Sequence, residues 1–224
     1  MSAPRIVSLV PSATETLIAW DRVPVACTRF CEQPSLRHVG GTKNPDLRAI
    51  VEAEPDLVVM DREENRREDH DALVAAGLDV HVVEIRSLAD VDPAMAALSA
   101  RVDASWDPIG VLPESPAITA AAVPIWRRPW MWLAEPTYGT SLLAALGVRN
   151  VVEDRGPYPS VELDEVITFG ADLVIAPNEP YEFGEQHREE LSRIAPVRFV
   201  DGKDLVWWGV RTRGALERLG AVLR

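Results

Sequence analysis

Two stretches of this chain repeat each other at an offset of 116 residues, and each reads as a helix followed by a buried strand. An acidic polar loop, 61–64 or 178–182, comes after each strand. The matching positions pair Leu47, Ile50, Val51, Asp56, Leu57, Val58 and Val59 with Leu163, Val166, Ile167, Asp172, Leu173, Val174 and Ile175. The repeat predicts two related α/β lobes. The alternative is a chance match, because helix-strand units resemble one another.

Strand-like and helix-like patterns alternate through both halves. Ser12 and Glu15 form an S-x-x-E capping box that predicts a helix through about Trp20. The expected strands are 6–10, 23–31, 57–60, 80–85, 123–126, 173–176 and 197–200, and helical patterns include 87–102, 163–170 and 211–223. Continuously apolar strands that alternate with helices are typical of parallel sheets covered by helices.

Prolines interrupt the alternation near the middle of the chain. Pro108, Pro113 and Pro116 exclude one long regular helix across this stretch. We therefore predict an N-terminal lobe at 1–103, an inter-lobe linker at 104–120 and a C-terminal lobe at 121–224.

Charge and hydropathy exclude several classes of partner. The net charge of −12 opposes a nucleic acid, because phosphate binding depends on Lys and Arg. No apolar run approaches the roughly 18 to 20 residues that span a bilayer. The chain as given also lacks a recognisable signal peptide before its first strand, which predicts a cytoplasmic location, with a removed leader as the alternative.

Cys27 and Cys31 are the two cysteines of the chain. On an extended strand their Cα atoms would lie about 13 Å apart, beyond the ~7 Å limit for a disulfide. This spacing predicts two buried or half-buried thiols and no structural disulfide.

Catalytic and metal-binding motifs are not recognisable in the chain. The four histidines are scattered, and none has a second His or Cys at a metal-ligand spacing. Acidic loops around Glu63 and Glu179 suit either acid-base chemistry or the docking of a basic surface. We predict no catalytic residue, no metal site and no enzyme activity.

Aromatic and arginine side chains concentrate where the expected strands end, which is where open parallel sheets bind ligands. Five of the seven tryptophans lie in the segments 126–132 and 207–208. Strand alternation would place Trp126, Arg128, Trp130 and Trp132 on one face. An aromatic wall binds a large flat ligand, and arginine adds bonds to its polar rim. We predict ligand contacts from Arg62, Arg128, Trp130, Trp207 and Trp208, with packing in the core as the alternative.

Several motifs resemble the helical-backbone (class III) substrate-binding proteins of ABC importers, the clade that binds cobalamin and ferric siderophores. The motifs follow one another in order over nearly the whole chain. They are Arg5–Glu15, Thr28–Cys31, Val39–Asp46, Pro55–Val59 and Glu63–Asn65 in the first half, and Pro124–Trp130, Thr137–Gly139, Asn150–Val151, Tyr158–Pro159 and Asp172–Ile175 in the second.

The resemblance implies two lobes, each with a parallel sheet flanked by helices, joined by a single helical linker and holding a ligand in the cleft between them. By position in the motifs it implies cleft-lining roles for Pro11, Ser12, Phe30, Asp61, Trp130, Tyr158 and Trp208. It also implies that Glu68 and Asp164 dock on arginines of an ABC permease.

These observations predict a non-catalytic binding protein for a metal chelate, a cobalamin-like corrinoid or a ferric siderophore, associated with ABC-type import. No resident cofactor is expected. The alternative is a cytoplasmic enzyme or a metallocofactor-handling protein built on the same fold.

Overall fold

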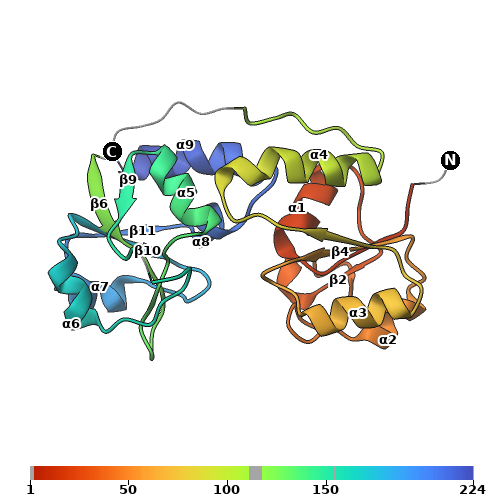
Figure 1. The fold of residues 1–224 in the computed structure, drawn as a ribbon, viewed down its shortest axis with the longest axis horizontal. Coiled ribbons are helices and arrows are strands. Elements are labelled where there is room, and N and C mark those ends of the chain that lie inside the picture. Colours follow the sequence, from red (N-terminus) through yellow and green to blue (C-terminus); the bar gives the residue numbers. More distant parts are fainter. Residues whose placement is uncertain (1–2, 111–117, 154, 224) are drawn as a thin grey trace. The chain divides into compact units, whose positions relative to one another are not determined.

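The computed structural model describes residues 3–110, 118–153 and 155–223, which form two compact units (Figure 1). The first unit contains the chain up to Ile85 together with Asp90–Pro108 and Trp208–Val210. The second contains Arg86–Ala89, Ile109–Trp207 and the chain from Arg211 onward. The predicted lobe boundaries stay predictions.

The first unit is built on a five-stranded parallel sheet with the order β3-β2-β1-β4-β5. Helices α2 and α3 lie over one face, and α1 and α4 over the other (Figure 1). Apolar side chains of β1, β2 and β4 fill its core. The elements are β1 (Ile6–Ser8), α1 (Pro11–Ala19), β2 (Ala26–Cys27), β3 (Arg37–His38), α2 (Leu47–Glu52), β4 (Leu57–Asp61), α3 (Arg67–Ala75), β5 (Val80–Val83) and α4 (Val91–Arg101).

The second unit is built on a four-stranded parallel sheet with the order β11-β10-β6-β9 and carries a separate two-stranded hairpin, β7-β8. Helices α5 and α9 lie on one side of the sheet, and α6 and α7 on the other (Figure 1). The elements are β6 (Thr119–Ala122), β7 (Pro124–Trp126), β8 (Met131–Trp132), α5 (Tyr138–Ala145), β9 (Val148–Asn150), α6 (Leu163–Val166), β10 (Leu173–Pro177), α7 (Arg188–Leu191), β11 (Val197–Val200), α8 (Gly202–Val206) and α9 (Arg211–Leu223).

The two units repeat one topology. The order β2-β1-β4-β5 in the first sheet corresponds to β9-β6-β10-β11 in the second, and β4 and β10 are offset by 116 residues. The aspartate before each of these strands makes the same bond. Asp56 Oδ2 accepts from the backbone N–H of Arg5 at 2.8 Å, and Asp172 Oδ2 accepts from that of Ala120 at 2.9 Å. The predicted pair of related α/β lobes with parallel sheets is therefore confirmed.

The predicted capping box at the start of α1 is wrong. The helix begins at Pro11, with Val10 as its N-cap residue and no side-chain cap. Proline suits the first helical position because its missing N–H would have no partner there. Ser12 therefore lies inside the helix, and it is buried.

The strand predicted over 23–31 is also wrong in its length. Regular pairing is confined to Ala26–Cys27, and after Thr28 the chain turns into a 3-10 helix over Arg29–Cys31. Thr28 and Cys31 are buried in this turn, whereas Arg29 and Phe30 are exposed.

The predicted linker has no helix in the residues that the structure describes. Residues 104–110 form neither helix nor strand, residues 111–117 lie outside the described ranges, and β6 begins at Thr119. The helical linker implied by the resemblance is therefore not seen in these residues. The prolines give the reason, because proline cannot continue a helical hydrogen-bond ladder.

Candidate functional site

One edge of the first sheet gathers half of the predicted ligand-binding residues. Its strands are parallel, so the loops that follow β1, β2 and β4 all leave from the same edge. Pro11 and Ser12 begin α1 after β1, Phe30 follows β2, Asp61 ends β4 and Arg62 comes next. Phe30 and Arg62 are exposed, Pro11 is half-buried, and Ser12 and Asp61 are buried.

Asn65 ties these loops together from beneath. Its side-chain oxygen accepts from the backbone N–H of Asp61 at 2.8 Å. Its amide nitrogen donates to the carbonyl oxygen of Thr42 at 2.9 Å and lies 3.4 Å from that of Leu9. Asn65 is buried, so one side chain holds three loops at this edge. These bonds fix the three loops relative to one another.

Phe30 supplies the exposed aromatic ring of this edge. It is 50% exposed, and the guanidinium carbon of Arg29 lies 4.8 Å from its ring centroid. The ring passes close to Gly41, where a Cβ atom would lie 3.0 Å from the Phe30 ring and 2.6 Å from Asn44 Oδ1. A glycine at 41 therefore allows the ring its position.

Asp61 is a buried carboxylate at the same edge. Its Oδ1 accepts from the backbone N–H groups of Glu63 at 2.8 Å and Glu64 at 2.9 Å. Burial nevertheless dominates and raises the pKa of Asp61 to about 6, although the two hydrogen bonds lower it. Keeping this carboxylate ionised at neutral pH thus costs stability.

Replacing Asp61 by asparagine is expected to stabilise the first unit at pH 7. Asparagine Oδ1 can accept the same two N–H bonds without a buried charge. A shift of about 2 pKa units sets an upper bound of roughly 3 kcal/mol on the gain. Urea unfolding at pH 7 of the wild type and Asp61→Asn measures it.

The pH dependence has a definite sign. The folded pKa of Asp61 is raised above the unfolded value of 3.8, so the folded state binds its proton more tightly. The contribution of Asp61 to the free energy of unfolding of the wild type therefore rises as the pH falls from about 7 to about 4. Asp61→Asn should lack that rise, whereas Glu63→Gln, an exposed change in the same loop, should keep it. Equal pH profiles for the wild type and Asp61→Asn would contradict this assignment.

The tryptophan-rich segment of the second unit is a hairpin, so the predicted single face of alternating residues is wrong. The chain turns between β7 and β8, and Arg128, an exposed residue of the turn, has a φ of +68°. Trp126 is 43% exposed, whereas Trp130 is buried. Trp132 is completely buried and donates its indole N–H to the carbonyl oxygen of Val161 at 2.8 Å. A turn separates side chains that an extended strand would have aligned.

An aromatic row runs from the exposed Trp126 into the core. Trp126 meets Tyr181 edge to face with 5.5 Å between ring centroids, and Tyr181 lies 4.7 Å from Phe183. Phe183 stacks on Trp130 at 6.1 Å, and Trp130 stacks on Trp132 at 5.7 Å. We call these five residues the aromatic row. Sequence reasoning missed Tyr181 and Phe183, whose signal was two aromatic residues within and beside the acidic loop after β10.

His187 and Arg127 hold the row in place. His187 packs its ring edge to face against Tyr181 and Phe183, and its Nδ1 lies 3.2 Å from the N–H of Gly184. The Arg127 guanidinium lies 5.9 Å from the centroid of Trp130 and forms an ion pair with Glu190 at 2.8 Å. These neighbours fix the row without covering all of Trp126.

Tyr158 lies beside the hairpin. It is 40% exposed, between two prolines whose carbonyl oxygens accept from the β8 region. The backbone N–H of Ala134 donates to the carbonyl oxygen of Pro157 at 2.9 Å, and the backbone N–H of Trp132 donates to that of Pro159 at 3.0 Å. The structure therefore attaches the Tyr158 segment to the strand that carries Trp132.

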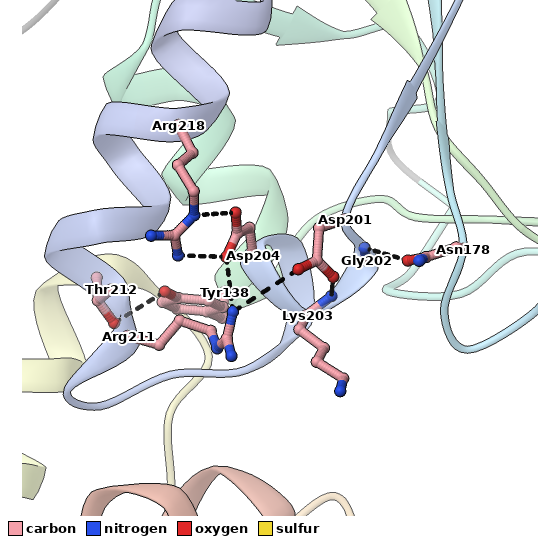
Figure 2. A network of polar contacts seen from close by, with 9 residues as sticks. All are labelled: Tyr138, Asn178, Asp201, Gly202, Lys203, Asp204, Arg211, Thr212 and Arg218. Atoms are coloured by element: carbon pink, nitrogen blue, oxygen red, sulfur yellow. Dashed lines mark hydrogen bonds and ion pairs between the residues drawn. The ribbon is translucent and has the colours of Figure 1, made fainter. Parts of the chain in front are cut away.

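Helices α8 and α9, which follow β11, are joined by a network of charged side chains (Figure 2). Asp204 is buried and binds Arg218 through both carboxylate oxygens, at 2.7 and 2.6 Å, and Arg211 at 3.0 Å. Lys203 and Arg211 lie 5.0 and 5.7 Å from the ring centroid of the half-buried Trp207. The network sets the position of Trp207 in the second unit.

Trp207 and Trp208 are neighbours in the sequence but belong to different units. Trp208 is 5% exposed and clusters with the first unit, whereas Trp207 belongs to the second. The ligand-binding role predicted for both stays a prediction.

The two predicted docking residues occupy similar places in separate units. Glu68 is exposed in the first turn of α3 and Asp164 in the first turn of α6. Asp164 forms an ion pair with Arg193 in the same unit. Their role toward a permease stays a prediction.

Neither a metal-binding cluster nor a membrane-spanning helix is present in the residues that the structure describes. Residues 3–110, 118–153 and 155–223 contain no group of three or more His, Cys, Asp or Glu side chains arranged to hold a metal ion. Across the same part of the chain, no helix combines the length and the apolar character needed to cross a membrane.

The resemblance found in the sequence is confirmed, because proteins of similar sequence or fold include binding proteins for vitamin B12 and heme. No protein-family model matches the chain. A vitamin B12-binding protein of Salmonella typhi is 28% identical over 189 residues, which cover 74% of this chain and 69% of the relative.

Solved structures match nearly the whole chain. The periplasmic vitamin B12 binding protein BtuF of Vibrio cholerae has a TM-score of 0.80 and 20% identity, with 99% of this chain and 96% of that chain covered. The periplasmic heme binding protein HutB of Vibrio cholerae has a TM-score of 0.78 and 17% identity, with 99% of both chains covered.

These similarities correct the predicted location. The sequence predicted a cytoplasmic protein, but the solved structures that share this fold include periplasmic proteins. The prediction relied on the lack of a signal peptide in the chain as given, which is a weaker indication than the fold. The similar proteins named above are described as binding proteins.

Proposed function

We propose that this chain is a non-catalytic, extracytoplasmic binding protein for a metal-bearing chelate and that it delivers this ligand to an ABC importer. The observation that carries the proposal is the match of nearly the entire chain to proteins described as binding vitamin B12 and heme. A cobalamin-like corrinoid is the first candidate ligand, because the matched sequence relative is a vitamin B12-binding protein. Heme and ferric siderophores are the other members of the class.

Exposed aromatic rings support a large flat ligand. Phe30, Trp126 and Tyr158 are each 40% to 50% exposed, although large aromatic side chains usually bury most of their surface. Phe30 lies in the 3-10 helix after β2, Trp126 ends β7 and Tyr158 lies in a loop. A macrocycle offers such rings an extensive apolar face, and its removal from water would drive binding.

Polar groups near the rings suit the rim of such a ligand. Arg62 and Arg128 are exposed beside the loops that carry Phe30 and Trp126. Guanidinium groups bind carboxylates and amide oxygens through paired hydrogen bonds. Pro11, Ser12, Asp61, Trp130, Trp207 and Trp208 complete the proposed ligand-binding set.

Two buried side chains that could act as an acid or a base, Asp61 and His187, are occupied by local contacts, which favours binding without catalysis. Asp61 Oδ1 accepts two backbone N–H bonds, and His187 is buried between two aromatic rings with Nδ1 close to a backbone N–H. A general acid or base must reach the substrate proton, and these groups are engaged in local structure. We therefore assign no catalytic residue and no resident cofactor, and we propose Glu68 and Asp164 as the permease-docking residues.

Titration with cyanocobalamin, heme and a panel of ferric siderophores tests the proposal. Tryptophan fluorescence and calorimetry should give a dissociation constant well below 100 μM for at least one of these compounds. A value of about 100 μM corresponds to only about −5.5 kcal/mol. Failure of every compound to bind at that level would remove the chelate from the proposal.

Phe30→Ala and Trp126→Ala are each expected to weaken binding of the identified ligand about tenfold. A stacked aromatic contact contributes roughly 0.5–1.5 kcal/mol beyond the area that it buries, and a factor of ten is about 1.4 kcal/mol. Calorimetry measures the change without relying on the fluorescence of the substituted tryptophan.

Val23→Ala is the matched control for these two variants, because Val23 is 56% exposed and lies outside the strand-end loops. It should bind like the wild type. Unchanged affinity in both aromatic variants would move the ligand away from these rings while leaving the class of ligand open to the titration.

A further inference from the structure

The side chains of Cys27 and Cys31 meet inside the first unit, although an extended strand would hold them far apart. Thr28 and the following 3-10 helix reverse the chain after β2, and the N–H of Cys31 donates to the carbonyl oxygen of Thr28 at 3.1 Å. The Cys27 thiol is near enough to Cys31 Sγ to influence its pKa. Both cysteines are buried, at 0% and 2% exposure, and neither is in a disulfide. The distance argument against a bond between them therefore fails.

Two hydroxyl groups surround the sulfur of Cys31. Thr14 Oγ1, in the first turn and a half of α1, lies 3.1 Å from Cys31 Sγ, and Thr28 Oγ1 lies 3.2 Å from it. Hydroxyls that donate to sulfur stabilise the thiolate over the thiol.

The thiol of Cys27 and these hydroxyls lower the pKa of Cys31 to about 6, against the opposing effect of burial. The interaction with Cys31, together with burial, raises the pKa of Cys27. One sulfur is thus disposed to act as the nucleophile while its neighbour keeps a proton. This asymmetry is the arrangement that a dithiol needs for exchange with a disulfide.

We propose that Cys27 and Cys31 form a redox-active dithiol that closes to an intramolecular disulfide. The co-reactant is a disulfide, either a small-molecule disulfide or the disulfide of a protein oxidant. The Cys31 thiolate attacks one of its sulfur atoms and expels the other as a thiolate. Cys27 then loses its proton and attacks the Cys31 sulfur of the mixed disulfide, which releases the second thiolate. Two thiols of the chain are oxidised, and one disulfide is reduced to two thiols.

The position of the pair connects it to the exposed ring at the edge of the sheet. Phe30 lies between the two cysteines in the sequence, so the bond would close a ring of five residues that contains it. Because both sulfurs are buried, the co-reactant reaches them during local opening of the turn, while the rest of the first unit stays folded. Extracytoplasmic compartments favour such oxidation, but the chemistry does not depend on the proposed ligand.

Oxidative refolding of the whole chain tests the inference. Denatured, reduced protein is refolded in buffer that contains reduced and oxidised glutathione, and the remaining thiols are alkylated and analysed by mass spectrometry. We expect the form that has lost two hydrogens and carries no alkyl group to exceed all other forms at least tenfold. Peptide mapping should place the bond between Cys27 and Cys31.

A folded product with two alkylated cysteines, or one that carries glutathione, would overturn the inference. The single variants Cys27→Ser and Cys31→Ser serve as references for the alkylated and glutathione-bearing products in the mass spectrum, because neither variant can form the internal bond. Thermal unfolding provides a second readout on the wild type itself. The oxidised form should melt above the same protein after reduction, and an oxidised form that melts lower would also refute the assignment.

Discussion

Trp132→Ala is expected to lower the free energy of unfolding by about 3–5 kcal/mol, the range measured for removal of large buried aromatic side chains. Trp132 has no exposed surface, stacks on Trp130 and donates its indole N–H to Val161. The substitution leaves a cavity and an unpaired carbonyl oxygen in the core of the second unit. Urea denaturation followed by circular dichroism measures the loss.

Trp126→Ala is the matched control for this prediction. The same chemical change is made six residues earlier, in the other strand of the same hairpin, but at a side chain that is 43% exposed. We expect a clearly smaller loss than for Trp132→Ala, because Trp126 buries less apolar surface and leaves no enclosed cavity. A loss as large as that of Trp132→Ala would show that the row acts as one packed unit from its exposed end inward.

The sequence could not distinguish these two tryptophans. An uninterrupted strand over 126–132 would have put both on one face, and proline was the only visible sign of a break. The hairpin depends on the backbone of Arg128, whose positive φ is uncommon for a residue with a side chain. Composition therefore indicated an aromatic site, and only the turn shows which rings are exposed.

The repeat, in contrast, could be predicted because it depends on hydrophobic periodicity and on one recurring contact. Asp56 and Asp172 precede corresponding strands and bind corresponding backbone groups, so the sequence match reflects a structural match. Parallel strand ends are equally predictable. The loops with Pro11, Phe30 and Asp61 had to share an edge once β1, β2 and β4 were adjacent. Long-range order of this kind follows from the pattern alone.

Local reversals of the chain were not predictable. The stretch from Val23 to Cys31 is apolar enough for one strand, yet regular pairing ends at Cys27 and a 3-10 helix follows over Arg29–Cys31. Nothing in apolar spacing distinguishes an inward-packed turn from a continuing strand. The same limit explains why Tyr181 and Phe183 were missed. The loop was interpreted from its acidic residues, so the packing of Tyr181 on Trp126 and of Phe183 on Trp130 was not predicted.

Asp204→Asn is expected to destabilise the second unit by about 2–4 kcal/mol at pH 7. The Asp204 side chain is 3% exposed and holds Arg218 and Arg211 through three hydrogen bonds (Figure 2). Breaking a buried pair by removing one partner typically costs 3–5 kcal/mol. We expect somewhat less because the Arg218 side chain is 55% exposed and can regain water. Urea unfolding of the wild type and the variant gives the difference.

Asp201→Asn should change the free energy of unfolding by less than about 0.5 kcal/mol, because the Asp201 side chain is 48% exposed and asparagine caps a helix as well as aspartate does.

The pH dependence of the free energy of unfolding provides a second control. Burial opposes the ionisation of Asp204, but the bonds from Arg218 and Arg211 outweigh it and hold the pKa of Asp204 below its ordinary value. A depressed folded pKa gives stability that is complete above about pH 4 and is lost as the pH falls through that folded value. The gap between the wild type and Asp204→Asn should therefore narrow in strong acid, and a gap that stays constant down to pH 2 would mean that the carboxylate charge is not what holds α8 and α9 together.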